Sequence, residues 1–158
     1  MENHAGGISI IAFVVALAVS IGYYQFVYIP EANAKPILKE IVLNPPEKTI
    51  VIIAEGSSLE SNPTFFDKKD QRATLEVSNR VIWENEDTVP HTVTTDDGYK
   101  DAYSGLFDSR ERPTEEGGAF VMPGKTFEFL FTKVGQYPYH CEPHPWMQGS
   151  IEIVENFS

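Results

Sequence analysis

The chain carries two hydrophobic patterns, and the change between them lies near residue 35. Residues 3–30 contain no Asp, Glu, Lys or Arg, and Ile8 to Ile29 consists mostly of Ile, Val, Ala, Phe and Tyr. As a helix this run of about 22 residues reaches about 33 Å, enough to cross a hydrocarbon core of about 30 Å. The pattern predicts a membrane segment within residues 1–35. Three aromatic residues at its end would lie at the membrane interface: Tyr23, Tyr24 and Tyr28.

After a lead-in over residues 36–48, the pattern changes to short runs bounded by Gly, Pro, Asn or Asp. These runs are "TIVIIA", "ATLEVS", "RVIWEN", "HTVTT", "TFEFLFTK", "GQYPYHC" and "GSIEIVE". In "TFEFLFTK" the alternation of Phe127, Phe129 and Phe131 with mostly polar residues predicts a strand with one face in a core. The pattern therefore predicts an all-β sandwich domain over residues 49–158.

The N-terminal segment also has features of a cleaved signal peptide. The sequence "ANA" at Ala32 to Ala34 looks like a cleavage site. However, the apolar run is longer than that of a signal peptide, and "MENH" lacks the usual positive charge. We therefore expect an uncleaved anchor, with the β-domain on the extracytoplasmic side.

The chain is acidic, with 12 Lys and Arg against 23 Asp and Glu and a formal net charge of −11. This charge disfavours nucleic acid as a partner. It either serves solubility alone or attracts a basic protein partner. The single cysteine, Cys141, has no second cysteine with which to form an intramolecular disulfide, so this thiol requires another explanation.

Cys141, His144 and Met147 have the spacing C-x2-H-x2-M, and we expect them on a short loop between two strands. A thiolate, an imidazole and a thioether form a soft ligand set that suits copper. A second imidazole would complete the ligand set of a blue copper site. His91 in "VPHTV" is the candidate, because alternation places it among inward-facing apolar residues. His140 precedes Cys141 directly and should point to the opposite face, so we interpret it as structural.

The segments "ENEDTVPHTVTT", "MPGKTFEF" and "GQYPYHCEPHPWMQGSIEI" resemble the small blue copper proteins, the cupredoxins, of the amicyanin and plastocyanin type. The resemblance implies a Greek-key β-sandwich that binds one copper ion, Cu(I) or Cu(II). It makes His91, Cys141 and His144 the equatorial ligands and Met147 the axial ligand. It also matches Asn85 to an asparagine that tethers the two ligand-bearing loops by hydrogen bonds.

The function that this resemblance implies is transfer of single electrons between redox proteins, which here would be basic or membrane-bound. We expect an electron-transfer surface at Pro143, Pro145 and Trp146, beside His144, although Trp146 is equally compatible with core packing.

Other functions fit part of the same pattern. The main alternative is a copper redox enzyme with an open, nitrosocyanin-like site that acts on a small molecule such as nitric oxide. Glu142 and the long segment Asp96 to Gly118 favour it, because both depart from the family pattern, and Met147 argues against it. A copper store and a structural zinc site are the remaining alternatives.

Overall fold

The computed structural model describes residues 4–111 and 119–157. The chain forms two compact units, Met1–Pro36 and Ile37–Ser158, and each is described by itself. The three-part division into residues 1–35, 36–48 and 49–158 stays a prediction.

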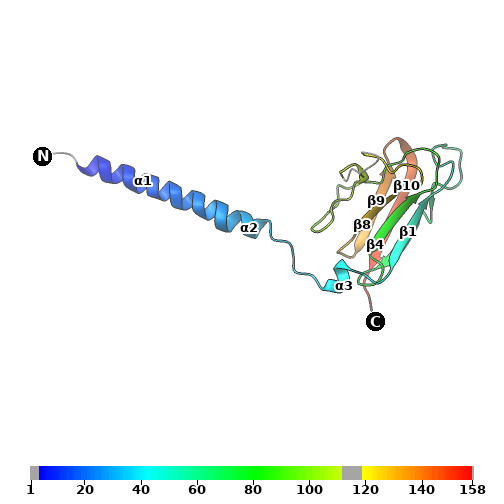
Figure 1. Cartoon of the computed structure of the whole chain (residues 1–158), viewed down its shortest axis with the longest axis horizontal. Helices are drawn as coiled ribbons and strands as arrows, with labels where there is room; N and C mark the ends of the chain where they lie inside the picture. The colour runs from blue at the N-terminus through cyan, green and yellow to red at the C-terminus, as the bar shows by residue number, and fades with distance from the viewer. Residues whose placement is uncertain (1–3, 112–118, 158) are drawn as a thin grey trace. The chain divides into compact units, whose positions relative to one another are not determined.

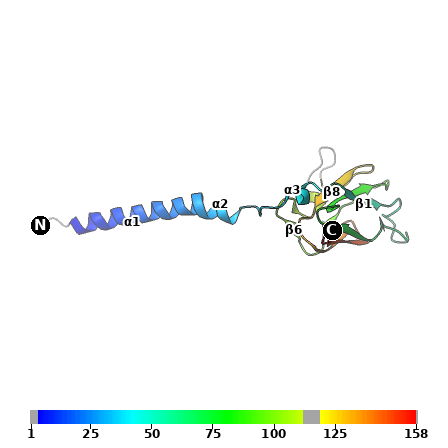
Figure 2. The same ribbon diagram turned by 90° about the horizontal axis from the view of Figure 1, so that it is seen from below.

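The N-terminal unit is helical. The helix α1 (His4–Tyr23), the π-helical turn η1 (Tyr24–Tyr28) and the helix α2 (Ile29–Ala32) follow one another without a break, as Figure 1 and Figure 2 show. The stretch Ser9–Ala32 is long and apolar enough to cross a membrane, and none of its apolar window is buried within the chain. A signal sequence passes the same test, so the predicted membrane anchor is compatible with the structure and stays a prediction.

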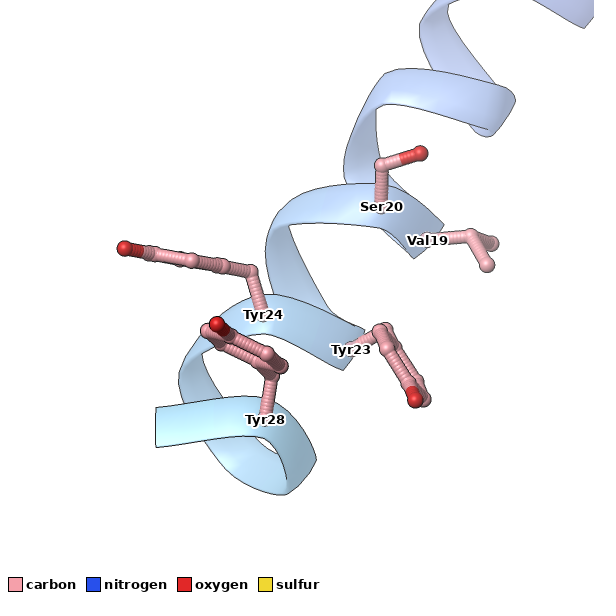
Figure 3. A pocket seen from close by; sticks show the side chains of 5 residues that line it. All are labelled: Val19, Ser20, Tyr23, Tyr24 and Tyr28. Atoms are coloured by element: carbon pink, nitrogen blue, oxygen red, sulfur yellow. The ribbon is translucent and has the colours of Figure 1, made fainter. Parts of the chain in front are cut away.

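The π-helical turn has a physical cause in Pro30, which lies within the first turn of α2. Proline has no N–H to donate to the carbonyl four residues earlier, and in an α-helix its ring clashes with that carbonyl. The wider turn relieves this conflict, and the N–H of Ile29 donates to the carbonyl of Tyr24, five residues back. The rings of Tyr24 and Tyr28 stack beside this turn, with centroids 5.4 Å apart. A shallow surface pocket lies here, and Figure 3 shows its lining: Val19, Ser20, Tyr23, Tyr24 and Tyr28.

The second unit contains two four-stranded sheets, and its strands are seen in Figure 1. The first sheet has the order β2 (Phe66–Asp67), β1 (Lys48–Ile53), β4 (Arg80–Asn85) and β8 (Thr126–Leu130). The second has the order β3 (Asp70–Thr74), β10 (His144–Val154), β9 (Gly135–Cys141) and β5 (Thr94–Thr95). The remaining elements are the short helix α3 (Glu40–Leu43), the pair β6 (Lys100–Asp101) and β7 (Gly105–Leu106), and the 3-10 turn η2 (Ser109–Glu111).

The two sheets share one core, which confirms the predicted all-β sandwich. Phe127, Phe129 and Phe131 are buried, as the alternation in "TFEFLFTK" predicts. Trp83 on β4 joins the layers, because its ring lies 5.5 Å from that of Tyr139 on β9 in an edge-to-face arrangement. This aromatic core lies directly next to Cys141, two residues after Tyr139.

Three predicted strands cover at least three residues fewer than their sequence runs. In "TFEFLFTK" the strand β8 ends at Leu130. In "ATLEVS" the strand β3 ends at Thr74, and a turn follows that brings the N–H of Ser78 to the carbonyl of Thr74. In "HTVTT" only Thr94–Thr95 pairs regularly, with His140 and Tyr139 of β9. Within the long segment Asp96 to Gly118, residues 100–101, 105–106 and 109–111 form β6, β7 and η2, while residues 112–118 lie outside the described part.

The buried carboxylate of Asp101 fixes this long segment to the sandwich. It accepts hydrogen bonds from the N–H groups of Tyr103 (2.8 Å), Ser104 (3.2 Å) and Thr132 (2.9 Å), and from the hydroxyls of Thr132 (2.7 Å) and Tyr99 (2.9 Å). Burial alone would raise the pKa of Asp101, but the N–H and hydroxyl groups around the charged form lower it below its usual value.

We expect Asp101→Asn to lower the free energy of unfolding by about 1–3 kcal/mol at pH 7, because the new amide places donors against donors. Since the folded pKa is lowered, the contribution of Asp101 is present above pH about 4 and is lost as the pH falls through the folded pKa. The difference between wild type and variant should therefore shrink between pH 7 and pH 3. Denaturant unfolding of the metal-free chain, followed by tryptophan fluorescence, measures it. The exposed Glu60 provides the control, and Glu60→Gln should change stability by less than about 0.5 kcal/mol.

Candidate metal centre

His91 lies between β4 and β5, where the backbone forms an isolated bridge rather than a full strand. Its N–H donates to the carbonyl of Val121 (3.1 Å), and the N–H of Val121 donates to the carbonyl of His91 (2.8 Å). Pro90 precedes it and offers no donor, which prevents continuation of the ladder. The imidazole is fully buried, as the alternation around "VPHTV" predicts.

Cys141 and His144 lie at the two ends of a tight hairpin. Cys141 is the last residue of β9, His144 is the first of β10, and the two are paired across the turn of Glu142 and Pro143. The expected short loop is therefore reduced to two residues, and the pairing becomes irregular between His144 and Gln148. Antiparallel pairing at the turn explains this difference, because it extends β10 back to His144.

The structure brings His91, Cys141 and His144 together as one cluster. The Cys141 Sγ lies 3.5 Å from the Nδ1 of His91 and 3.5 Å from the Nδ1 of His144, and the two nitrogens are 3.2 Å apart. The centre of this triangle is about 2 Å from each atom, which agrees with typical metal–nitrogen distances of about 2.0–2.1 Å and a metal–sulfur distance of about 2.3 Å. The residues therefore fit a metal ion, and sulfur with two imidazoles fits copper.

The protonation of His91 is set by a buried carboxylate. Its Nε2 lies 2.9 Å from the Oδ2 of Asp87, which is itself buried. Burial would raise the pKa of Asp87, but the hydrogen bond from His91 and the N–H groups of Gly56, Thr88 and Ser58 lower it to about 2. The Asp87 anion therefore places the proton on Nε2 and leaves the Nδ1 lone pair of His91 directed at the cluster. Burial also lowers the pKa of His91, which favours the neutral imidazole that a metal requires.

The Cys141 thiol is fully buried, and its surroundings favour the protonated form when no cation is present. Burial raises the pKa of Cys141, although the N–H of Thr92, 3.3 Å from the sulfur, counteracts this effect. A metal ion would replace the thiol proton, since the thiolate is the ligand.

Met147 is fully buried on β10 and belongs to the hydrophobic core. It follows His144 by three residues, within the irregular stretch of pairing with β9. Its role as the axial ligand stays a prediction.

The predicted electron-transfer surface contains two kinds of residue. Pro143 and Pro145 are exposed on either side of His144, which is half-buried. Trp146 is half-buried, its ring centroid lies 5.4 Å from that of His144, and its Nε1–H donates to the carbonyl of Ser57 (3.1 Å). Trp146 thus packs against the sandwich instead of standing free on the surface.

Asn85 donates from its side-chain amide to the carbonyls of Val89 (2.9 Å) and Val121 (2.8 Å), and it accepts from the N–H of Asp87 (2.9 Å). These bonds shape the segment that leads to His91. Its role as a tether between the two ligand-bearing loops stays a prediction.

Thr92 makes direct contacts between the two ligand-bearing segments. Its N–H donates to the Cys141 sulfur, and its Oγ1 accepts from the N–H of Glu142 (2.9 Å). Sequence reasoning missed Thr92 and Asp87. The available signals were a hydroxyl residue directly after a predicted ligand and a carboxylate four residues before it.

Glu142 is exposed beside the ligand hairpin, and its charge is paired. Its carboxylate lies 3.1 Å from the Arg110 guanidinium, which also contacts Asp108 at 2.7 Å. The negative charge of Glu142 is therefore part of a surface network, in which each pair contributes little to stability.

Comparisons with known proteins agree with this centre. Residues 56–154 match the family model described as copper binding proteins, plastocyanin/azurin family. The chain is 28% identical over 79 residues to amicyanin from Paracoccus denitrificans and 29% identical over 84 residues to amicyanin from Paracoccus versutus. These alignments cover 50% and 52% of this chain and 52% and 53% of the relatives, so the chain spans about half the length of the curated relatives it matches.

A purple cupredoxin from Nitrosopumilus maritimus has a similar structure, with a TM-score of 0.51 and 23% identity over 68% of this chain and 100% of the other. This likeness supports the cupredoxin fold. The matched residues include all four predicted ligands. Copper is the metal of this family, as the ligand set predicts. The chain belongs to the plastocyanin/azurin family of copper-binding proteins.

Proposed function

We propose that this chain is a membrane-anchored, extracytoplasmic type 1 copper protein that carries single electrons between redox partners. The observation that carries the proposal is the triangle of His91, Cys141 and His144, whose donor atoms lie 3.2–3.5 Å apart inside a closed sandwich. Met147 completes the proposed ligand set.

Copper in such a donor set supplies one-electron chemistry, because it is stable as Cu(I) and as Cu(II). The protein's own contacts would hold the donors in place in both oxidation states of the copper. Cys141 is held by the β9–β10 pairing and by Thr92, and His91 is held by Asp87 and by the bridge to Val121. Donors that move little between the two states favour fast electron transfer.

His144 provides the route to a partner. His91, Cys141 and Met147 are fully buried, whereas His144 is half-buried between two exposed prolines. A redox protein that contacts Pro143 and Pro145 would therefore approach the imidazole of His144 most closely. We infer that this partner is basic or membrane-bound, since the chain has a formal net charge of −11.

The burial of the site also favours an electron carrier over an enzyme. An open site for a small molecule needs a coordination position that solvent can reach. The Met147 side chain, three residues after His144, is fully buried, so solvent does not reach it. A nitrosocyanin-like site would require an open axial position, which the Met147 variant tests.

The full chain in detergent should bind one copper(II) ion and show an intense visible absorption, because a thiolate is among the ligands. Cys141→Ser should abolish this absorption, and His144→Gln should weaken copper binding. Visible and paramagnetic-resonance spectra measure both effects.

His140→Gln is the matched control for the histidine variant, since His140 lies beside Cys141 but contacts Asp96 instead of the cluster. It should retain the wild-type spectrum. A Cys141→Ser chain that kept the colour would contradict the proposal, as would a wild-type chain that bound zinc and no copper.

Met147→Leu should retain copper and the thiolate colour, because three other ligands supply most of the binding, and it should raise the reduction potential by removing a donor to Cu(II). Voltammetry and the visible spectrum measure this. The half-buried Met122 provides the control, and Met122→Leu should change neither. Suppose instead that the wild type bound added azide or nitric oxide, and that Met147→Leu changed neither the potential nor the spectrum. The axial position would then be open, and a copper redox enzyme would be the better assignment.

The native chain should fractionate with membranes and be released only by detergent, because Ser9–Ala32 is long enough to span. Mass spectrometry of the isolated protein identifies its N-terminus. A mature chain that began at Lys35 would show that "ANA" is a cleavage site and would refute the anchor.

A further inference from the structure

The turn at residues 54–58 directly follows β1 and contacts both histidine-bearing segments. None of its residues is a predicted ligand, and it lies more than 30 residues before His91 in the sequence. Three consecutive residues each use one backbone group to bond outside the turn: the N–H of Gly56, the carbonyl of Ser57 and the N–H of Ser58. The two N–H groups bond to the segment that contains His91, and the carbonyl bonds to the segment that contains His144.

The N–H groups of Gly56 and Ser58 bind Asp87, the partner of His91. Gly56 donates to the Oδ1 of Asp87 (3.0 Å) and Ser58 donates to the Oδ2 (3.2 Å). The same Oδ2 accepts from the Nε2 of His91 (2.9 Å). Asp87 is 3% exposed, so water competes little for these bonds. The N–H of Thr88, outside the turn, also donates to the Oδ1 of Asp87 (2.7 Å). The orientation of the His91 ring thus depends on the turn together with Thr88.

The carbonyl of Ser57 contacts the segment that follows the Cys141–His144 hairpin. Ser57 accepts from the Nε1–H of Trp146 (3.1 Å), which stands between His144 and Met147 in the sequence. The Trp146 ring also contacts the His144 ring, with centroids 5.4 Å apart. Displacement of the Ser57 carbonyl would therefore shift the side chain that packs against the second imidazole.

The turn is itself held firmly. The Ser57 side chain is fully buried, and its hydroxyl lies within hydrogen-bond distance of the carbonyls of Ala54 and Phe65. Gly56 has a φ of +77°, and a Cβ at this position would lie 2.8 Å from the Nδ2 of Asn62. Glycine is therefore required for this backbone conformation.

We propose that the turn at residues 54–58 is a positioning element that couples the two histidine sides of the copper centre, with Asp87 and Trp146 as its positioning residues. This inference rests on the proposed copper function. The Asp87 carboxylate stabilises the more positive copper state through His91, and the turn transmits any shift of Trp146 to Asp87. Loss of either contact should change the reduction potential although neither residue touches the metal.

The experiment uses the full chain in detergent, loaded with copper, and measures the reduction potential, the thiolate absorption and amide hydrogen exchange. Asp87→Asn keeps the shape of the side chain and removes its charge. It should raise the potential and weaken copper(II) binding by about 10–100-fold. Trp146→Phe removes the hydrogen bond to Ser57 and also shortens the ring that packs against His144. It should speed exchange at the N–H groups of Gly56 and Ser58.

The double variant tests the coupling. If both residues act through one turn, the change in potential for the pair differs from the sum of the two single changes. Gly56→Ala tests the turn without altering either positioning residue. It should also shift the potential, and it keeps the test decisive if Asp87→Asn does not fold.

Two matched controls separate positioning from general destabilisation. Asp101→Asn alters another buried carboxylate with several N–H partners, and Tyr137→Phe removes another aromatic donor to a backbone carbonyl, that of Lys133 (2.8 Å). Both should lower stability and leave the potential and the thiolate absorption unchanged.

The proposal is overturned if Trp146→Phe and Gly56→Ala fold with the wild-type potential and exchange, or if the changes in the double variant simply add. These results are distinguishable from failure of the proposed function, because that failure appears as a wild-type chain without the copper spectrum.

Discussion

The burial of one thiol beside two imidazoles is the constraint on which the rest of the structure depends. Burial raises the pKa of Cys141 and lowers that of His91, so both groups favour their neutral forms when no cation is near. The ligand atoms of Cys141, His91 and His144 nevertheless lie 3.2–3.5 Å apart. Their closeness is imposed by the scaffold around them, so the three atoms are already assembled in the absence of a cation.

Three neighbouring strands of the second sheet bring these residues together. The adjacent strands β9 and β10 supply Cys141 and His144 through a turn of two residues, and β5 pairs with β9 just beyond the segment of His91. Hydrogen bonds of Thr92 and Asp87 then fix the sulfur and one ring. The aromatic core beneath, with Trp83 between the sheets, resists the shifts that would let the donors separate.

The clustering of His91, Cys141 and His144 and the sandwich could be predicted because they depend on local signals. The spacing of Cys141, His144 and Met147 and the alternation around His91 are visible in the sequence itself. The extension of β10 to His144 was missed because it depends on pairing with β9. Asp87 was missed for a similar reason. Its position four residues before His91 is the one local signal, and its burial and bonding depend on amide groups of a turn some 30 residues away.

The short stretch between α2 and α3 has a consequence for how the domain would meet its partners. Residues 34–39 form neither helix nor strand, and six residues of extended chain span at most about 20 Å. In the proposed anchored state, such a tether confines the copper domain to a thin layer above the lipid surface. The search for a partner in the same bilayer is then two-dimensional, and its rate follows the density of that partner in the membrane instead of its concentration in bulk solution.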